Sequence, residues 1–157
     1  MTKVRFSLNG EVAEVEVEPR ELLLDTLRDR LAMTGAHAGC EQGSCGACTV
    51  LVDGCGVRSC LMFTVQVGGS EVRTIEGVGS PGSLHPIQQA LSTHHGLQCG
   101  FCTPGMVLTA LELFETDPHP SRDRIEEWMS GNLCRCTGYV NIVKALEAVA
   151  GTAEEQL

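Results

Sequence analysis

Nine cysteines in two separate groups are the strongest constraint on what this 157-residue chain can fold into. Five lie between residues 40 and 60, and four lie between residues 99 and 136. The chain starts without the apolar run behind a basic segment that marks a secretory leader, so we expect it in the reducing cytoplasm. Thiols there serve metal binding or redox chemistry rather than disulfides. The sequence therefore predicts two metal or redox sites, one in each half.

The first cysteine group has the C-x4-C-x2-C…C spacing of plant-type [2Fe–2S] proteins. Its predicted ligands are Cys40, Cys45, Cys48 and Cys60. Four thiolates on two ferric ions and two sulfides leave a net charge of about −2, which backbone N–H groups must offset. Gly39, Gly43 and Gly46 would let the chain wrap closely enough to do so. A zinc site is the alternative, but the four-residue step and the density of glycines favour the cluster.

Two further residues near the first group can in principle bind metal. His37 precedes the group by three positions, and Cys55 lies in the turn-like segment 53–56. Because four cysteines already fill the ligand positions, we interpret His37 as a loop residue and Cys55 as a free thiol.

The second cysteine group is less diagnostic. It consists of the pairs Cys99-x2-Cys102 and Cys134-x-Cys136. Four thiolates at these spacings can hold either a [2Fe–2S] cluster or a structural zinc ion, and spacing alone leaves both open. Predicted helix starts near Cys102 and Cys136 favour an anionic site. Arg135 is interpreted either as a positive charge beside that site or as an ordinary surface arginine.

The apolar pattern changes from mixed to helical near the middle of the chain. Before that point, an Asn9-Gly10 hairpin turn, a helical stretch and β-favouring runs predict a β-grasp arrangement. The expected elements are strands over 4–8, 12–17, 49–52 and 71–75 and a helix over 21–31. After that point, start signals and helical spacing predict four short helices in a bundle. They are expected to begin near Pro86, Thr103, Ser121 and Tyr139, with Thr103 and Ser121 as N-cap residues.

The predicted fold class is therefore α+β, with two domains. We expect a β-grasp domain with the plant-type [2Fe–2S] site over residues 1–76, a Gly- and Ser-rich linker over 77–83, and an all-α four-helix domain with the second site over 84–157. Each half has only about 75 residues, a size at which a hydrophobic core is marginal and a metal cluster adds a needed staple.

Composition argues against several classes of function. The formal net charge of −9 and only six aromatic residues argue against nucleic-acid binding. No apolar stretch is long enough to span a membrane. No phosphate-binding loop and no activated nucleophile motif is found, so we expect no catalytic residue in this chain.

Three motifs, in this order, resemble a known family. They are GCEQGSCGACTV at 39–50, QCGFCTPGM at 98–106 and SGNLCRCTGY at 130–139. Together they resemble the small iron–sulfur subunit of the molybdenum hydroxylases, the xanthine oxidase family that includes aerobic carbon monoxide dehydrogenase. The similarity runs from about residue 3 to residue 150, and all eight ligand positions are intact.

The resemblance implies an electron-transfer subunit with two [2Fe–2S] clusters. The N-terminal domain would be plant-ferredoxin-like, with its cluster facing FAD on a medium subunit or another acceptor. Cys99, Cys102, Cys134 and Cys136 would ligate the cluster nearer to molybdenum. Gln98 and Cys136 would lie within hydrogen-bonding reach of the molybdopterin, which a large partner subunit holds.

The resemblance also implies a heteromeric oxidoreductase, such as a dimer of heterotrimers. Its substrate stays open between carbon monoxide, purines, aldehydes and N-heterocycles. The alternatives are a free-standing ferredoxin-like electron carrier and a zinc-stabilised interaction module.

Overall fold

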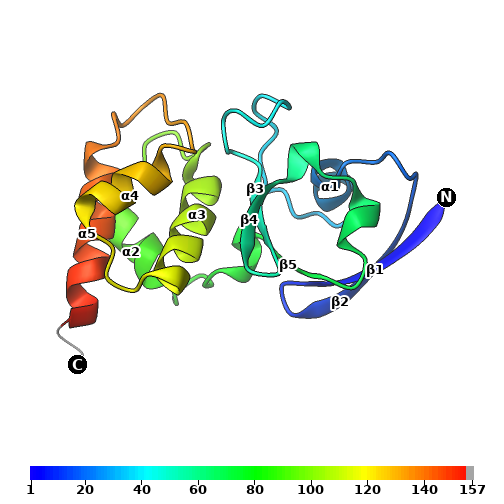
Figure 1. The fold of residues 1–157 in the computed structure, drawn as a ribbon, viewed down its shortest axis with the longest axis horizontal. Coiled ribbons are helices and arrows are strands. Elements are labelled where there is room, and N and C mark those ends of the chain that lie inside the picture. The colour runs from blue at the N-terminus through cyan, green and yellow to red at the C-terminus, as the bar shows by residue number, and fades with distance from the viewer. Residues whose placement is uncertain (155–157) are drawn as a thin grey trace.

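A twisted five-stranded sheet forms the N-terminal half of the molecule. The computed structural model describes the backbone of residues 1–154, and Figure 1 shows the sheet beside a separate group of helices. The strand order is β2-β1-β5-β3-β4, with β1 and β5 parallel and the other pairs antiparallel. The strands are β1 (Thr2–Leu8), β2 (Glu11–Val17), β3 (Thr49–Val52), β4 (Cys55–Arg58) and β5 (Glu71–Arg73).

The hairpin β1–β2 turns at Asn9 and Gly10, as predicted, and both residues have positive φ. The predicted strand over 71–75 is shorter than expected and ends at Arg73. The next residue, Thr74, donates its backbone N–H to the side-chain oxygen of Asn9 at 2.8 Å, so this N–H takes no part in the sheet. A 3-10 turn, Ile75–Gly77, follows. The segment 53–56, expected to be a turn throughout, contains the start of β4 at Cys55.

The helix expected over 21–31 has a different form from the prediction. It consists of a short α-helical turn, α1 (Leu23–Asp25), followed by a π-helical segment, Thr26–Arg30. Thr26 is fully buried and its hydroxyl lies 2.7 Å from that of Thr64, while its carbonyl accepts from the N–H of Leu31 five residues later. Apolar spacing reports which face is buried and does not distinguish these helix types. The leucines of this segment pack against the sheet as expected.

Four helices form the C-terminal half, and all four begin near the predicted positions. They are α2 (Pro86–Thr93), α3 (Thr103–Thr116), α4 (Arg122–Met129) and α5 (Val140–Glu154). Ser121 caps α4 as predicted, since its hydroxyl accepts from the N–H of Arg124 at 3.3 Å. Cys102, rather than Thr103, is the N-cap residue of α3. His85 caps α2 through Nδ1, which accepts from the N–H of Ile87.

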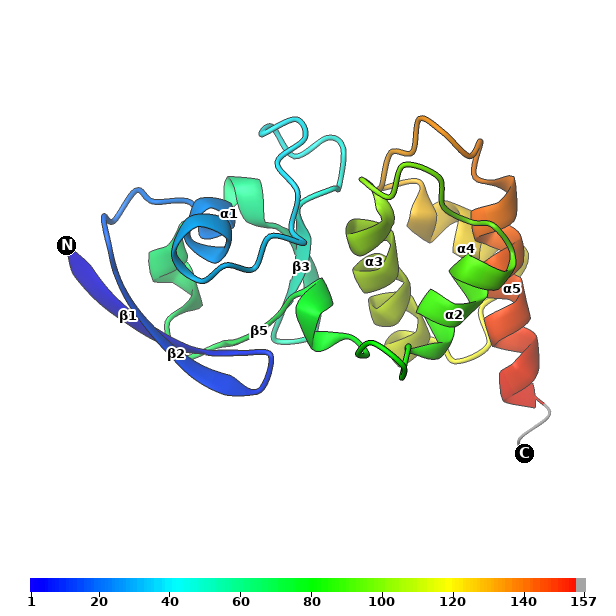
Figure 2. The same ribbon diagram turned by 180° about the vertical axis from the view of Figure 1, so that it is seen from behind.

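The two halves meet where β3 packs against α3 (Figure 2). Gly105, in the first turn of α3, lies so close to Gly46 that an added Cβ would stand 2.3 Å from the Gly46 carbonyl oxygen. Asn132 is fully buried beside this contact. Its amide donates to the Gly46 carbonyl at 3.3 Å, and its oxygen accepts from the Thr109 hydroxyl at 3.2 Å. The interface therefore depends on close backbone approach and one bridging amide.

Within the described residues, no helix is long and apolar enough to cross a bilayer. The last three residues of the predicted second domain lie outside the described part of the chain.

We expect Asn132→Ala to destabilise the protein by about 1–3 kcal/mol, because it removes the buried hydrogen bonds of the Asn132 amide with the Gly46 carbonyl and the Thr109 hydroxyl. The midpoint of thermal unfolding of the cluster-loaded protein, followed by circular dichroism, should fall by about 2–10 °C. Asn141→Ala removes a more exposed amide and is the matched control, with an expected change below about 0.5 kcal/mol. Equal unfolding midpoints for the two variants would contradict the bridging role of Asn132.

Candidate metal centres

The first cysteine group lies in the loop before β3 and in the 3-10 turn Ser59–Leu61. Cys48 and Cys60 are buried, and the Cys48 thiol is close enough to contribute to the raised pKa of Cys60. Cys40 and Cys45 are half-buried, and the N–H of Cys45 donates to the Cys40 sulfur at 3.4 Å. The structure thus brings all four predicted residues into one region, as two neighbouring pairs.

The two pairs differ in their electrostatic environment. Backbone N–H groups of Gln42 and Cys45 lower the pKa of the Cys40 thiol to about 6. Burial and the neighbouring Cys48 thiol raise the pKa of Cys60 to about 11. Donors aimed at Cys40 stabilise negative charge there, which is what a thiolate ligand of an anionic cluster requires.

Three glycines of the first loop lie where a side chain would meet neighbouring atoms. A Cβ on Gly39 would stand 3.0 Å from the Cys45 sulfur. Gly43 and Gly46 have positive φ values of +82° and +74°, and a Cβ on either would meet a neighbour within 3 Å. A side chain at Gly39 would therefore crowd a thiol, whereas one at Gly43 would meet Leu61 and one at Gly46 would meet Asn132.

The second cysteine group lies at the end of the helical half that adjoins the first group. The sulfurs of Cys99 and Cys136 are exposed and 3.5 Å apart. Cys102 and Cys134 are half-buried. Burial, with a further contribution from the Cys134 thiol, raises the pKa of Cys102 to about 12. Burial also acts on Cys134, but hydrogen bonds from Thr137 and Cys136 outweigh it and lower the pKa of Cys134.

Pairwise contact of the thiols bears on the kind of metal group that fits. A single zinc ion requires four ligands that converge on one point. A [2Fe–2S] cluster instead distributes four thiolates over two irons. The donor set of each group, four thiols meeting in twos beside a cradle of backbone N–H groups, therefore fits a two-iron cluster.

The two cysteine loops are joined directly. The N–H of Leu133, next to Cys134, donates to the carbonyl of Cys45 at 2.8 Å. His37 stacks on Phe101 with ring centroids 4.6 Å apart, and its Nδ1 lies 2.7 Å from the Phe101 carbonyl oxygen. His37 is thus more than the plain loop residue expected, because it connects the segment before the first group to the segment between Cys99 and Cys102. Local spacing carries no signal for a partner 64 residues away.

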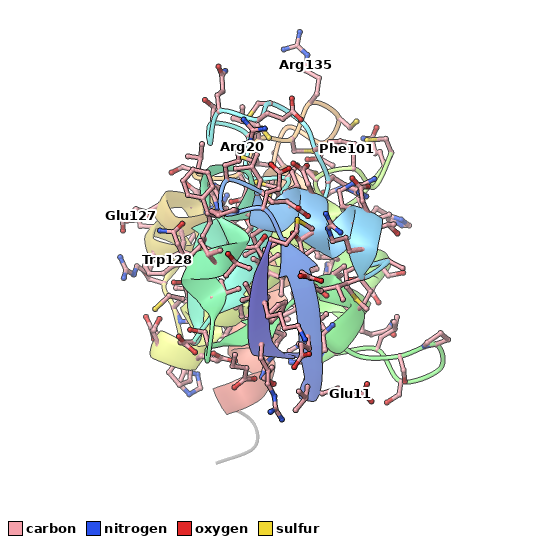
Figure 3. All side chains as sticks on the ribbon, turned by 90° about the vertical axis from the view of Figure 1, so that its right-hand side faces the viewer. Glu11, Arg20, Phe101, Glu127, Trp128 and Arg135 are labelled. Atoms are coloured by element: carbon pink, nitrogen blue, oxygen red, sulfur yellow. The ribbon has the colours of Figure 1, made fainter. Side chains whose placement is uncertain are left out.

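The residues predicted to face molybdopterin lie together on the surface. Gln98 donates from its amide to the Cys136 carbonyl at 3.1 Å, and both residues are exposed. Arg135, between two cysteines of the second group, projects outward from this end of the molecule, which also carries Phe101 (Figure 3).

Comparison with known proteins identifies the family. A 2Fe-2S iron-sulfur cluster binding domain matches residues 6–70, and a [2Fe-2S] binding domain matches residues 74–147. Caffeine dehydrogenase subunit gamma of Pseudomonas sp. (strain CBB1) is 49% identical over 154 residues, which cover 96% of this chain and 92% of that subunit. This chain belongs to the small iron–sulfur subunits of the molybdenum hydroxylases.

Two further relatives agree with this assignment. The nicotine 6-hydroxylase small subunit of Paenarthrobacter nicotinovorans is 49% identical, over 92% of this chain and 87% of that subunit. The crystal structure of quinoline 2-oxidoreductase from Pseudomonas putida 86 superimposes with a TM-score of 0.93 at 46% identity, over 98% of this chain and 96% of that chain. The expected family is therefore confirmed, and so is a second [2Fe–2S] domain where spacing alone left zinc open.

We expect Cys48→Ala to lower the iron content from about four to about two per chain, because one of two [2Fe–2S] clusters loses a ligand. Iron and acid-labile sulfide analysis, together with electron paramagnetic resonance (EPR) spectra of the dithionite-reduced protein, would measure this loss. Cys55→Ser changes an exposed cysteine outside both groups and should leave the iron content and both signals unchanged. Unchanged iron in Cys48→Ala, or loss of iron in Cys55→Ser, would contradict the ligand set.

Proposed function

We propose that this chain passes electrons from a molybdopterin site on a large partner subunit to FAD on a medium subunit or to another acceptor. When bound, the two [2Fe–2S] clusters supply one-electron carriers. The observation that carries the proposal is the direct hydrogen bond between the two cysteine loops, from Leu133 N–H to the Cys45 carbonyl at 2.8 Å. Two carrier sites joined in this way lie in series within one subunit.

We assign the plant-type cluster to Cys40, Cys45, Cys48 and Cys60, and the second cluster to Cys99, Cys102, Cys134 and Cys136. The neighbouring positions of the thiols within each group support this assignment.

The exposure of the second site supports contact with a partner. Cys99, Cys136 and Gln98 are open to solvent, so a bound molybdopterin could approach Gln98 and Cys136 from outside. Exposed apolar side chains nearby, Phe101 at 46% and Leu133 at 56%, would be covered by a large subunit. A free-standing electron carrier needs neither these exposed apolar side chains nor a second cluster domain.

The choice of substrate belongs to a partner in this proposal. The relatives named above carry caffeine, nicotine and quinoline in their names, yet two of their subunits are equally similar to this chain at 49% identity. A subunit that passes electrons without touching the substrate would show this pattern. The substrate of the complex is therefore defined by the pocket of the large subunit.

The proposal extends to domain limits, assembly and location. The first domain would span 1–76 and the second 84–157, with 77–83 as the linker. Helices α2–α5 would form a four-helix bundle, which is supported by the packing of α2 on α3 and α5 and of α4 on α3 and α5. The complex would contain a large and a medium subunit beside this chain. These heterotrimers would associate further, for example into a dimer of heterotrimers, and the complex would lie in the cytoplasm.

We expect Cys134→Ser in the intact complex to block electron flow out of the molybdenum site while leaving FAD bound. Rapid-freeze EPR after mixing with substrate should then show molybdenum reduced, with the plant-type cluster and the flavin oxidised for at least tenfold longer than in the wild type. Cys55→Ser is the control and should behave like the wild type. Wild-type turnover with the native acceptor in Cys134→Ser would contradict the electron route.

A further inference from the structure

We propose that the Thr137 hydroxyl raises the reduction potential of the second cluster by donating a hydrogen bond to the Cys134 sulfur. The inference rests on the proposed function only in taking Cys134 as a cluster ligand. Thr137 itself would touch no iron, so it is a tuning residue rather than a ligand.

The geometry fixes the direction of this hydrogen bond. Thr137 Oγ1 lies 3.1 Å from Cys134 Sγ. The same oxygen accepts from the backbone N–H of Tyr139 at 3.2 Å. A hydroxyl has one hydrogen to donate and two lone pairs, one of which accepts the Tyr139 N–H, and a thiolate ligand has no hydrogen to donate in return. The hydrogen is therefore free to point at the sulfur, and the Tyr139 N–H polarises it further.

The turn that positions Thr137 is strained. Gly138 and Tyr139 are consecutive residues in the left-handed region, with φ values of 62° and 67°. A tyrosine with positive φ costs free energy and persists only where surrounding contacts hold it. Here the Tyr139 hydroxyl accepts from the Cys134 N–H at 2.8 Å and donates to the Asn132 carbonyl at 3.2 Å. Tyr139 thus binds both the Cys134 backbone and the Thr137 oxygen.

The Thr137 hydroxyl donates to the sulfur of a residue taken as a ligand of the second cluster. One-electron reduction makes the cluster more negative, so donors at a ligand sulfur stabilise the reduced form more than the oxidised form. Removing a donor at Cys134 must therefore make the second cluster harder to reduce.

The test compares Thr137→Val, which keeps the shape without the hydroxyl, with Thr137→Ser, which keeps the hydroxyl. EPR-monitored redox titration of the intact complex gives the midpoint potential of each cluster. In Thr137→Val we expect the equilibrium constant for reduction of the second cluster to fall about tenfold, equivalent to about 59 mV for one electron. The plant-type cluster serves as the internal standard and should not move, and Thr137→Ser should restore the wild-type value.

An unchanged second-cluster potential in Thr137→Val would overturn the inference, and so would an equal shift in Thr137→Val and Thr137→Ser. If Thr137→Val does not assemble its clusters, Thr137→Ala removes the same hydroxyl with less bulk and must show the same shift. The assignment of the ligand is tested separately, because Cys134→Ser should lose the signal of the second cluster. Retention of that signal would refute Cys134 as a ligand, whereas an unmoved potential in the Thr137 variants refutes only the tuning role.

Discussion

The close approach of Gly46 and Gly105 is the contact on which the rest of the structure depends. It joins the loop of the first cysteine group to the start of α3, and α3 begins directly after Cys102. Asn132 fills the space beside it and connects both to the segment that carries Cys134. Arg58, at the end of β4, donates to Gly131 and Thr49 and so ties the same corner to the sheet. One packed corner therefore fixes the distance and orientation between the two cysteine loops.

Around this corner, the protein controls charge mainly through backbone and hydroxyl donors. Within the described part of the chain, the polar groups that contact the cysteine sulfurs are N–H groups, the Thr137 hydroxyl and other thiols, and no lysine or arginine side chain is among them. Donors of this kind stabilise the anion without neutralising it, so the added electron remains available to the next acceptor. The two sites differ in their exposure to solvent. Cys48 and Cys60 of the first group are buried, whereas Cys99 and Cys136 of the second group are exposed.

The parts of the fold that could be predicted from sequence have local causes. The Asn9-Gly10 hairpin, the Ser121 cap and the ligand spacing all depend on residues a few positions apart. The parts that were missed depend on distant partners. The π-helical segment contains Thr26, which meets Thr64 in the core, and β5 ends where Asn9 binds Thr74. Likewise, Asn132 and the contact of His37 with Phe101 lie within or beside the recognised motifs, but their roles appear only when residues far apart in sequence meet.

EPR spectroscopy of the fully reduced native complex at low temperature tests the central claim most directly, namely that one chain holds two [2Fe–2S] clusters in adjoining loops. The account predicts two distinct spin-½ signals of equal intensity, each split or broadened by its magnetic interaction with the other. A single cluster signal, or two signals without any mutual interaction, would contradict the arrangement of two carriers in series.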